Sequence, residues 1–337
     1  MDHAPLGTTP IRVSRIILGC GNFGGIGSAP AFFGKGEGRD EAFAVMDAAW
    51  AAGITTFDTA DAYGGGRSET WIGDWIRARR PQGLVLSTKT FNPMAEGADR
   101  GLAPARVRRQ LESSLRRFCV ERIDMYLAHE WDPDVPIADT AGVFDELVAE
   151  GRIGAYGLSN VDGAKLEQAR AHGRFGWVQN GYSLLDRDAE REVLPLCERH
   201  ALGFTPFSPL AGGWLTGKYR RGVAPTGASR LGEDPGRGLE AWERRGTERT
   251  WALLDALRER ADRLGRTPAG LALAWVTGRP GVASALVGAR TVEQLRSSLD
   301  GGREPLDPET RQALDALSAP VPPDYPYAFL DEIDPPE

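Results

Sequence analysis

The chain has 337 residues, of which 41% are hydrophobic, and its 40 Lys and Arg against 47 Asp and Glu leave a formal charge of −7. That composition supports a large core, and it excludes most nucleic-acid binders because phosphate neutralisation requires a basic face. No stretch approaches the roughly 18 uninterrupted apolar residues of a membrane span, and residues 1–10 lack the pattern of a signal peptide, so we expect a cytoplasmic protein without membrane association.

Apolar runs of four to seven residues alternate along the chain with longer segments of helical period. Eight runs are predicted to be buried strands, at residues 15–19, 54–58, 84–89, 123–129, 153–159, 177–180, 203–207 and 283–288. Helical patterns lie at 41–52, 69–80, 104–118, 138–149, 163–172, 189–200 and 291–299, and Thr267, Thr291 and Asp307 are typical N-cap residues. Eight alternating units predict an α/β fold, in the form of a (β/α)₈ TIM barrel.

The barrel is expected to be a single domain over residues 1–337, because no linker divides the chain. Its core would span about 11–318. The segment 208–246, after the seventh strand, is rich in Gly, Arg and Pro and predicts a long loop used as a lid or a binding loop. Residues 319–337 are too rich in proline for a helix and form an expected C-terminal tail, whose aromatic residues suggest packing.

The first strand leads into a glycine-rich segment, Gly19-Cys20-Gly21-Asn22-Phe23-Gly24, which matches the dinucleotide fingerprint G-x-G-x-x-G. That fingerprint requires a helix that begins within the glycines, whereas residues 25–30 (GIGSAP) cannot start one. We therefore reject a Rossmann fold. The segment is predicted to be a loop at the barrel mouth, where Gly21 and Asn22 allow a ligand to approach the backbone closely.

Four polar residues lie at or just beyond the ends of the second, third and fourth predicted strands: Asp58, Tyr63, Lys89 and His129. Strand ends converge at one mouth of a barrel, so these side chains are expected to meet. Singly, each has an ordinary explanation as a cap, a loop aromatic, a rim charge or a polar group at the core edge. Together they predict a Lys89–Asp58 pair, because an unpaired charge there is costly, and a Tyr63 whose pKa the lysine lowers. Such a tyrosine would be a general acid.

Six short motifs, in this order, resemble the signature segments of the aldo-keto reductase superfamily. They are residues 58–64 (DTADAYG), 87–90 (STKT), 126–129 (YLAH), 157–160 (GLSN), 179–182 (QNGY) and 208–219 (SPLAGGWLTGKY). The resemblance covers roughly residues 11 to 329. It implies that Tyr63 protonates a substrate carbonyl, that Lys89 paired with Asp58 tunes the pKa of Tyr63, and that His129 orients the carbonyl. It also implies a hydride from a nicotinamide cofactor.

The same resemblance assigns cofactor contacts. It places Asp58, Ser159, Asn160 and Gln179 near the nicotinamide, Phe207 on its ring, Ser208, Leu210, Gly212 and Lys218 around the pyrophosphate, and Gln294 and Ser298 near the adenosine end. Ser159 and Asn160 could equally cap a helix, Phe207 could be a core residue, and Gln294 could complete a capping box with Thr291.

The loop after the eighth strand predicts an anion site independently of the resemblance. Gly288 and Arg290 precede a capped helix, so backbone N–H groups and a guanidinium would face a phosphate there. The family binds the adenosine 2′-phosphate at this position, which implies NADPH, with NADH as the other possibility. Ser297-Ser298 replaces the Glu-Asn pair common in the family, which weakens the expected adenine contacts.

The predicted substrate is a small carbonyl compound, and the predicted substrate pocket comprises Tyr63, Phe91, His129, Trp131 and Trp214. No metal is expected, since Cys20, Cys119 and Cys197 are too few and too widely spaced for a zinc cluster or a disulfide framework. Two alternatives remain open. One is a slow or non-catalytic nicotinamide-binding sensor or regulatory subunit, and the other is an aldolase that uses Lys89 as a Schiff-base amine.

Overall fold

The computed structural model describes residues 1–226, 230–233, 236 and 240–320. Eight strands form one parallel sheet in the order β10-β3-β4-β5-β6-β7-β8-β9. They are β3 (Ile16–Gly19), β4 (Thr56–Asp58), β5 (Val85–Thr90), β6 (Ile123–Ala128), β7 (Ile153–Ser159), β8 (Trp177–Gln179), β9 (Gly203–Phe204) and β10 (Ala285–Val287). Each overlaps one of the eight predicted runs, which confirms the strand predictions.

The sheet closes on itself between its first and last strands. Ala283 donates its backbone N–H to the carbonyl of Phe204 at 2.9 Å, and Leu286 donates to Pro206 at 2.8 Å. These bonds join the β10 region to the β9 region and leave no open edge there. The predicted (β/α)₈ barrel is therefore confirmed, and the carboxyl ends of all eight strands meet at one mouth.

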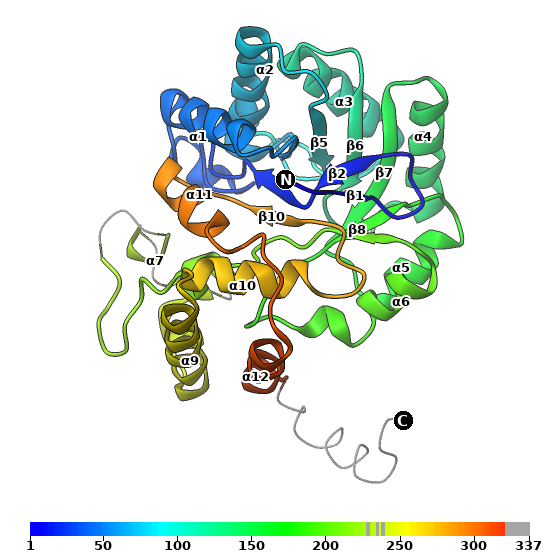
Figure 1. The fold of residues 1–337 in the computed structure, drawn as a ribbon. Helices are drawn as coiled ribbons and strands as arrows, with labels where there is room; N and C mark the ends of the chain where they lie inside the picture. The colour runs from blue at the N-terminus through cyan, green and yellow to red at the C-terminus, as the bar shows by residue number, and fades with distance from the viewer. Residues whose placement is uncertain (227–229, 234–235, 237–239, 321–337) are drawn as a thin grey trace.

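Helices surround the barrel (Figure 1). They are α1 (Arg39–Ala51), α2 (Arg67–Arg79), α3 (Pro104–Phe118), α4 (Ile137–Ala149), α5 (Gly163–Arg170), α6 (Val193–Arg199), α9 (Glu248–Leu264), α10 (Pro268–Thr277), α11 (Val292–Leu299) and α12 (Pro308–Ser318). On α3 the buried apolar residues Val107, Leu111, Leu115 and Phe118 recur at helical spacing, which turns one face toward the core. None of the described helices combines the length and apolar character needed to cross a bilayer.

Three predicted helix starts are confirmed by their N-caps. The side chains of Thr267, Thr291 and Asp307 each accept a hydrogen bond from the backbone N–H three residues later, at the starts of α10, α11 and α12. Such a bond satisfies one of the unpaired donors of the first turn and is worth about 1 kcal/mol.

An N-terminal hairpin was not predicted. Its strands β1 (His3–Pro5) and β2 (Arg12–Ser14) pair antiparallel, and Figure 1 shows them crossing one end of the barrel. Leu6 and Val13 pack there in a separate cluster with Ile17, Met125 and Trp177 from the barrel interior. Three-residue strands without an alternating apolar pattern leave no signal in the sequence, so only the packing shows that the hairpin covers this end.

Other differences lie in the second half of the chain. The predicted helix at 189–200 is divided into η3 (Asp188–Glu190) and α6, where Pro195 occupies the first turn. The predicted loop at 208–246 contains η4 (Ala211–Thr216), α7 (Arg230–Glu233) and α8 (Trp242–Arg245) within its described residues. Helix α9 follows it and was not predicted. Residues 321–337, and with them most of the predicted tail, lie outside the described residues.

Candidate active site

The four polar residues predicted at the strand ends lie together. Asp58 is the last residue of β4, Lys89 lies in β5, and His129 follows β6. Tyr63 opens the short helix η2 (Tyr63–Gly66), and its ring packs edge-on against the His129 ring at 5.5 Å between centroids. The hydroxyl of Tyr63 is 3.5 Å from Nε2 of His129. The Tyr63 hydroxyl and Nε2 of His129, which come from different strand ends, thus lie side by side.

A buried ion pair lies beneath these two atoms. Nζ of Lys89 donates to Oδ1 of Asp58 at 2.5 Å and to the carbonyl of Thr59 at 2.7 Å, and both charged side chains are almost fully buried. The other carboxylate oxygen, Oδ2, accepts from Ser87 at 2.6 Å and from Gln179 at 3.2 Å. Every oxygen of Asp58 has a partner, which is what a buried charge requires.

The charge on Lys89 is maintained by its neighbours. Burial alone would lower the pKa of Lys89, but the Asp58 carboxylate and Tyr63 outweigh burial and raise it. The lysine is therefore a fixed cation near neutral pH. Its Nζ lies 5.2 Å from the centre of the Tyr63 ring, so the phenol stands beside a permanent positive charge.

His129 is neutral in this environment. Burial, assisted by the charge of Lys89, holds the pKa of His129 well below its usual range. Its Nδ1 is 3.4 Å from the amide nitrogen of Asn92, which can only donate. The proton of the neutral ring is thus assigned to Nε2, the nitrogen that faces Tyr63. Asn92 was not among the predicted site residues, although it lies in the loop after β5, where the strand-end argument could have found it.

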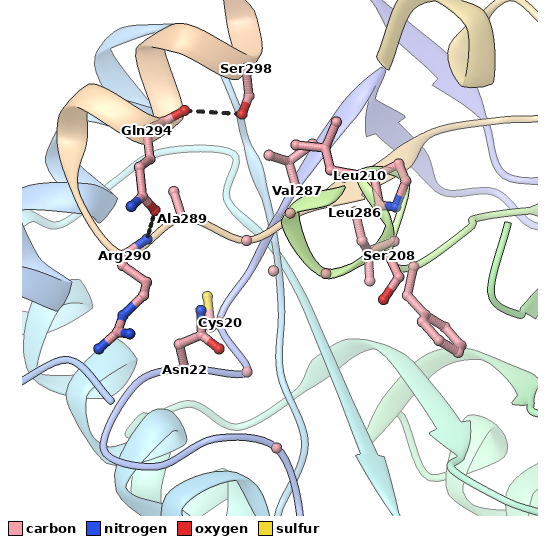
Figure 2. Close-up of a pocket in the computed structure, with 18 of the residues that line it drawn as sticks. Cys20, Asn22, Ser208, Leu210, Leu286, Val287, Ala289, Arg290, Gln294 and Ser298 are labelled. Atoms are coloured by element: carbon pink, nitrogen blue, oxygen red, sulfur yellow. Dashed lines mark hydrogen bonds between the residues drawn. The ribbon is translucent and has the colours of Figure 1, made fainter. Parts of the chain in front are cut away.

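A cavity of about 770 Å³ extends from Tyr63 and His129 to helix α11, a size typical of ligand pockets. All the predicted cofactor residues line it: Gly21, Asn22, Asp58, Ser159, Asn160, Gln179, Phe207, Ser208, Leu210, Gly212, Lys218, Gly288, Arg290, Gln294 and Ser298. Figure 2 shows Gln294 and Ser298 on one helix and Arg290 on the loop before it. Residues from the two halves of the chain therefore share one elongated cavity.

Small residues keep the cavity open between its ends. A Cβ at Gly21 would lie 3.4 Å from the Tyr63 ring, and one at Gly288 would lie 3.4 Å from the carbonyl oxygen of Gly19. At Gly212, where φ is +63°, a Cβ would collide with the carboxylate of Glu240. The cavity holds polar atoms and cations along its length, including Lys218 and Arg290. These features fit an extended, anionic dinucleotide.

The predicted substrate pocket is only partly seen at this cavity. Tyr63 and His129 line it, but Phe91, Trp131 and Trp214 are not among the described residues that do so. Trp214 is fully buried, stacks on Trp242 at 5.3 Å between centroids, and donates its indole N–H to the carbonyl of Glu240. It packs against aromatic residues of the region between β9 and α9. Its aromatic partners lie up to 37 residues away, so the sequence pattern alone did not reveal this packing.

Sequence reasoning also missed two acidic residues at the α11 end of the cavity. Glu37 forms an ion pair with Arg290, with Oε1 2.6 Å from Nε, and Glu293 lines the same end. Glu37 precedes α1 by two residues and was not among the predicted site residues. Its partner lies 253 residues further along the chain, a separation at which no local pattern signals a contact.

Comparison with known proteins agrees with the fold. Residues 15–319 match the model of the aldo/keto reductase family, and the chain belongs to that family. It is 34% identical to an uncharacterised oxidoreductase of Bacillus subtilis, YrpG, over 94% of this chain and 96% of that one, and 32% identical to the NADH-specific methylglyoxal reductase of Escherichia coli, over 89% and 93%. The glycerol dehydrogenase AKR11B4 of Gluconobacter oxydans superimposes with a TM-score of 0.81 at 28% identity, covering 96% of this chain and 98% of that structure.

Proposed function

We propose that the protein is a nicotinamide-dependent carbonyl reductase, which converts an aldehyde or a ketone into an alcohol. One observation carries the proposal: the hydroxyl of Tyr63 and Nε2 of His129, 3.5 Å apart, converge over the buried Asp58–Lys89 pair at one end of an elongated cavity. Membership of the aldo/keto reductase family supports it, as do relatives named as oxidoreductases.

Residues of this chain bind the carbonyl oxygen of the substrate and protonate it. A nicotinamide cofactor held by the cavity residues would supply the hydride for the carbonyl carbon. Tyr63 donates its hydroxyl proton to the oxygen, and the neutral His129 donates a hydrogen bond from Nε2 to the same atom. Lys89, kept charged by Asp58, stabilises the phenolate that Tyr63 becomes. Asn92 holds the tautomer of His129 in which Nε2 carries the proton.

The proposed cofactor residues are the fifteen that were predicted and that line the cavity. Arg290 supports the predicted use of NADPH, since a guanidinium suits a 2′-phosphate. Its ion pair with Glu37 supports the use of NADH instead, as does the printed name of the Escherichia coli relative. We further propose the predicted cytoplasmic location, which is supported by three cysteines that are all free thiols.

The geometry opposes a Schiff-base mechanism. A lysine attacks a carbonyl as the neutral amine, whereas Lys89 donates to Asp58 and its pKa is raised. A nicotinamide-binding sensor would share the cavity but would turn over no substrate. Turnover therefore decides between the sensor and the reductase.

The test is Tyr63→Phe, assayed by oxidation of NADPH and NADH with an activated aromatic aldehyde. We expect kcat to fall by about 10²- to 10⁴-fold while the dissociation constant for the dinucleotide stays the same, because only the proton donor is lost. Tyr156→Phe is the matched control, since the Tyr156 hydroxyl donates to Asp145 away from the cavity. Full activity of Tyr63→Phe would refute the proposed acid. Tight dinucleotide binding by the wild type without turnover on aldehydes, ketones and keto sugars would support the sensor.

A further inference from the structure

Helix α3 carries a buried arginine that the proposed mechanism does not use. Arg106 is only 3% exposed, although α3 lies on the outside of the barrel (Figure 1). Its Nη1 donates to the hydroxyl of Thr90 at 3.0 Å and to the carbonyl of Gly101 at 2.9 Å. Its Nη2 donates to the carbonyls of Asn92 at 2.8 Å and of Asp99 at 3.3 Å. These acceptors all lie in β5 or in the loop that joins β5 to α3, so one side chain fixes the course of this loop at the barrel mouth.

The bond to Thr90 connects Arg106 with the backbone of His129. Thr90 is the last residue of β5, and its carbonyl accepts from the backbone N–H of His129 at 3.0 Å. The Thr90 hydroxyl, which accepts from Arg106, donates in turn to Oδ2 of Asp61 at 2.7 Å. Asp61 lies two residues before Tyr63 in the chain. A buried chain of hydrogen bonds from Arg106 through Thr90 to Asp61 therefore supports the segments that carry both Tyr63 and His129.

The bond to Asn92 connects Arg106 with the ring of His129. By holding the Asn92 carbonyl, Nη2 of Arg106 fixes the backbone from which the Asn92 amide nitrogen lies 3.4 Å from Nδ1 of His129. That amide donates, so it selects the ring tautomer that carries the proton on Nε2. A distance of 3.4 Å is near the upper limit for a hydrogen bond, and a small displacement of the loop would break it.

The loop is also held from its other side. Oδ2 of Asp132, in the segment after β6, accepts from the backbone N–H of Leu102 at 2.6 Å. The neighbouring Gly101 has φ +107°, and a Cβ there would lie 2.6 Å from the same oxygen. Removal of Arg106 would leave the Gly101 carbonyl without this buried donor, and the loop would have to move to hydrate it.

We propose that Arg106 is a positioning residue of the reductase, which acts through Thr90 and Asn92 to hold His129 in the place and the tautomer that serve the substrate carbonyl. The inference rests on the proposed function. A guanidinium suits this task because it is a rigid planar fork of five donors, whereas a lysine offers a point charge on a flexible stem. Arg106, Thr90 and Asn92 are not among the described residues that line the cavity. Loss of Arg106 should therefore affect turnover and leave dinucleotide binding unchanged.

The test is Arg106→Met, with Arg15→Met as the matched control. Arg15 also holds backbone carbonyls, those of Val282 at 2.7 Å, Ala283 at 2.8 Å and Thr277, but it precedes β3 at the end of the barrel opposite to His129. Both variants should unfold at a lower urea concentration than the wild type. Only Arg106→Met should lower kcat with an activated aldehyde, by about 10- to 100-fold, with an unchanged dissociation constant for the dinucleotide, because a misplaced His129 donor stabilises the developing charge less well.

The ring nitrogens of His129 report the tautomer without any assay of activity. Long-range ¹H–¹⁵N spectra of the protein labelled at histidine distinguish a protonated from an unprotonated ring nitrogen, and His129→Gln assigns the signal. The wild type and Arg15→Met should carry the proton on Nε2, and Arg106→Met should show a mixture of tautomers. Asn92→Leu, which cannot donate, should show the same mixture. The loss of kcat in the Arg106→Met/Asn92→Leu double variant should be smaller than the product of the single losses, since both act on one ring.

A second substitution keeps the inference testable if Arg106→Met does not fold. Arg106→Lys keeps the charge without the planar fork, and it should show a reduced kcat and the mixture of tautomers. If the variants lose stability as Arg15→Met does but keep the wild-type kcat and the Nε2 tautomer, Arg106 has a structural role alone and the inference is refuted, while the reductase proposal stands. If the wild type turns over no carbonyl compound, the proposed function fails, and the spectra still decide whether Arg106 positions His129.

Discussion

The two ends of the cavity each contain an acid–base pair, but the pairs are built differently. Asp58 and Lys89 lie on adjacent strands and are almost fully buried, and Asp58 also accepts hydrogen bonds from Ser87 and Gln179. Glu37 and Arg290 lie on two loops, and the Arg290 side chain is 25% exposed toward the cavity. The first pair is part of the core. Both residues of the second pair line the cavity.

The largest effect is expected when the Asp58–Lys89 ion pair is broken. Lys89→Met leaves the Asp58 carboxylate buried without its cation, which should cost about 3–5 kcal/mol of unfolding free energy and remove catalysis. Urea denaturation measures the first effect and the aldehyde assay the second. In the Asp58→Asn/Lys89→Met double variant no lone charge remains, so part of the stability should return while activity stays lost. If the double variant loses as much unfolding free energy as the two single variants added together, the interaction between Asp58 and Lys89 is refuted.

A second buried carboxyl, that of Asp61, forms no ion pair among the described residues, and its burial is expected to make stability depend on pH. Burial raises the pKa of Asp61 to about 7, and Glu69 adds to the rise. Between about pH 4 and pH 7 the folded protein retains a proton that the unfolded chain has released, so raising the pH favours unfolding. Relative to Asp61→Asn, the wild type should lose up to about 4 kcal/mol of stability across this range.

Urea unfolding at several pH values measures that difference. Asp162→Asn is the control, because hydrogen bonds with the backbone and side chain of Lys165 lower the pKa of Asp162. Its stabilisation is present at neutral pH and is lost only as the pH falls below about 4. Parallel stability curves for the wild type and Asp61→Asn would show that Asp61 is charged at all these pH values in the folded protein.

The smallest effect is expected at the α11 end of the cavity. Thr291→Ala removes the N-cap of α11, which should cost about 1 kcal/mol and weaken dinucleotide binding a few-fold, with kcat at saturating cofactor unchanged. Thr247→Ala removes an equivalent cap from α9, away from the cavity, and should cost similar stability without a change in the dissociation constant. A fall in kcat for Thr291→Ala would mean that the two ends of the cavity are coupled.

Much of the catalytic end could be predicted because the positions and ends of strands follow from patterns of neighbouring residues. Asp58, Lys89 and His129 each follow or end a short apolar run, and parallel strands bring such residues to one mouth. Asn92 obeys the same rule and was simply not considered. The packing of Trp214 was not predicted, because its stacking partner, Trp242, lies 28 residues further along the same long segment.

The amino-acid sequence by itself determined the barrel, the positions of its strands and the convergence of the four polar residues, since buried runs and helical periods depend on neighbours a few residues apart. Only the tertiary structure decided what Arg290 is paired with. An ion pair between residues 37 and 290 requires that the first and last units of the barrel be adjacent, as the pairing of β10 with β3 makes them. The ion pair joins residues 253 positions apart in the chain, so no local pattern encodes it.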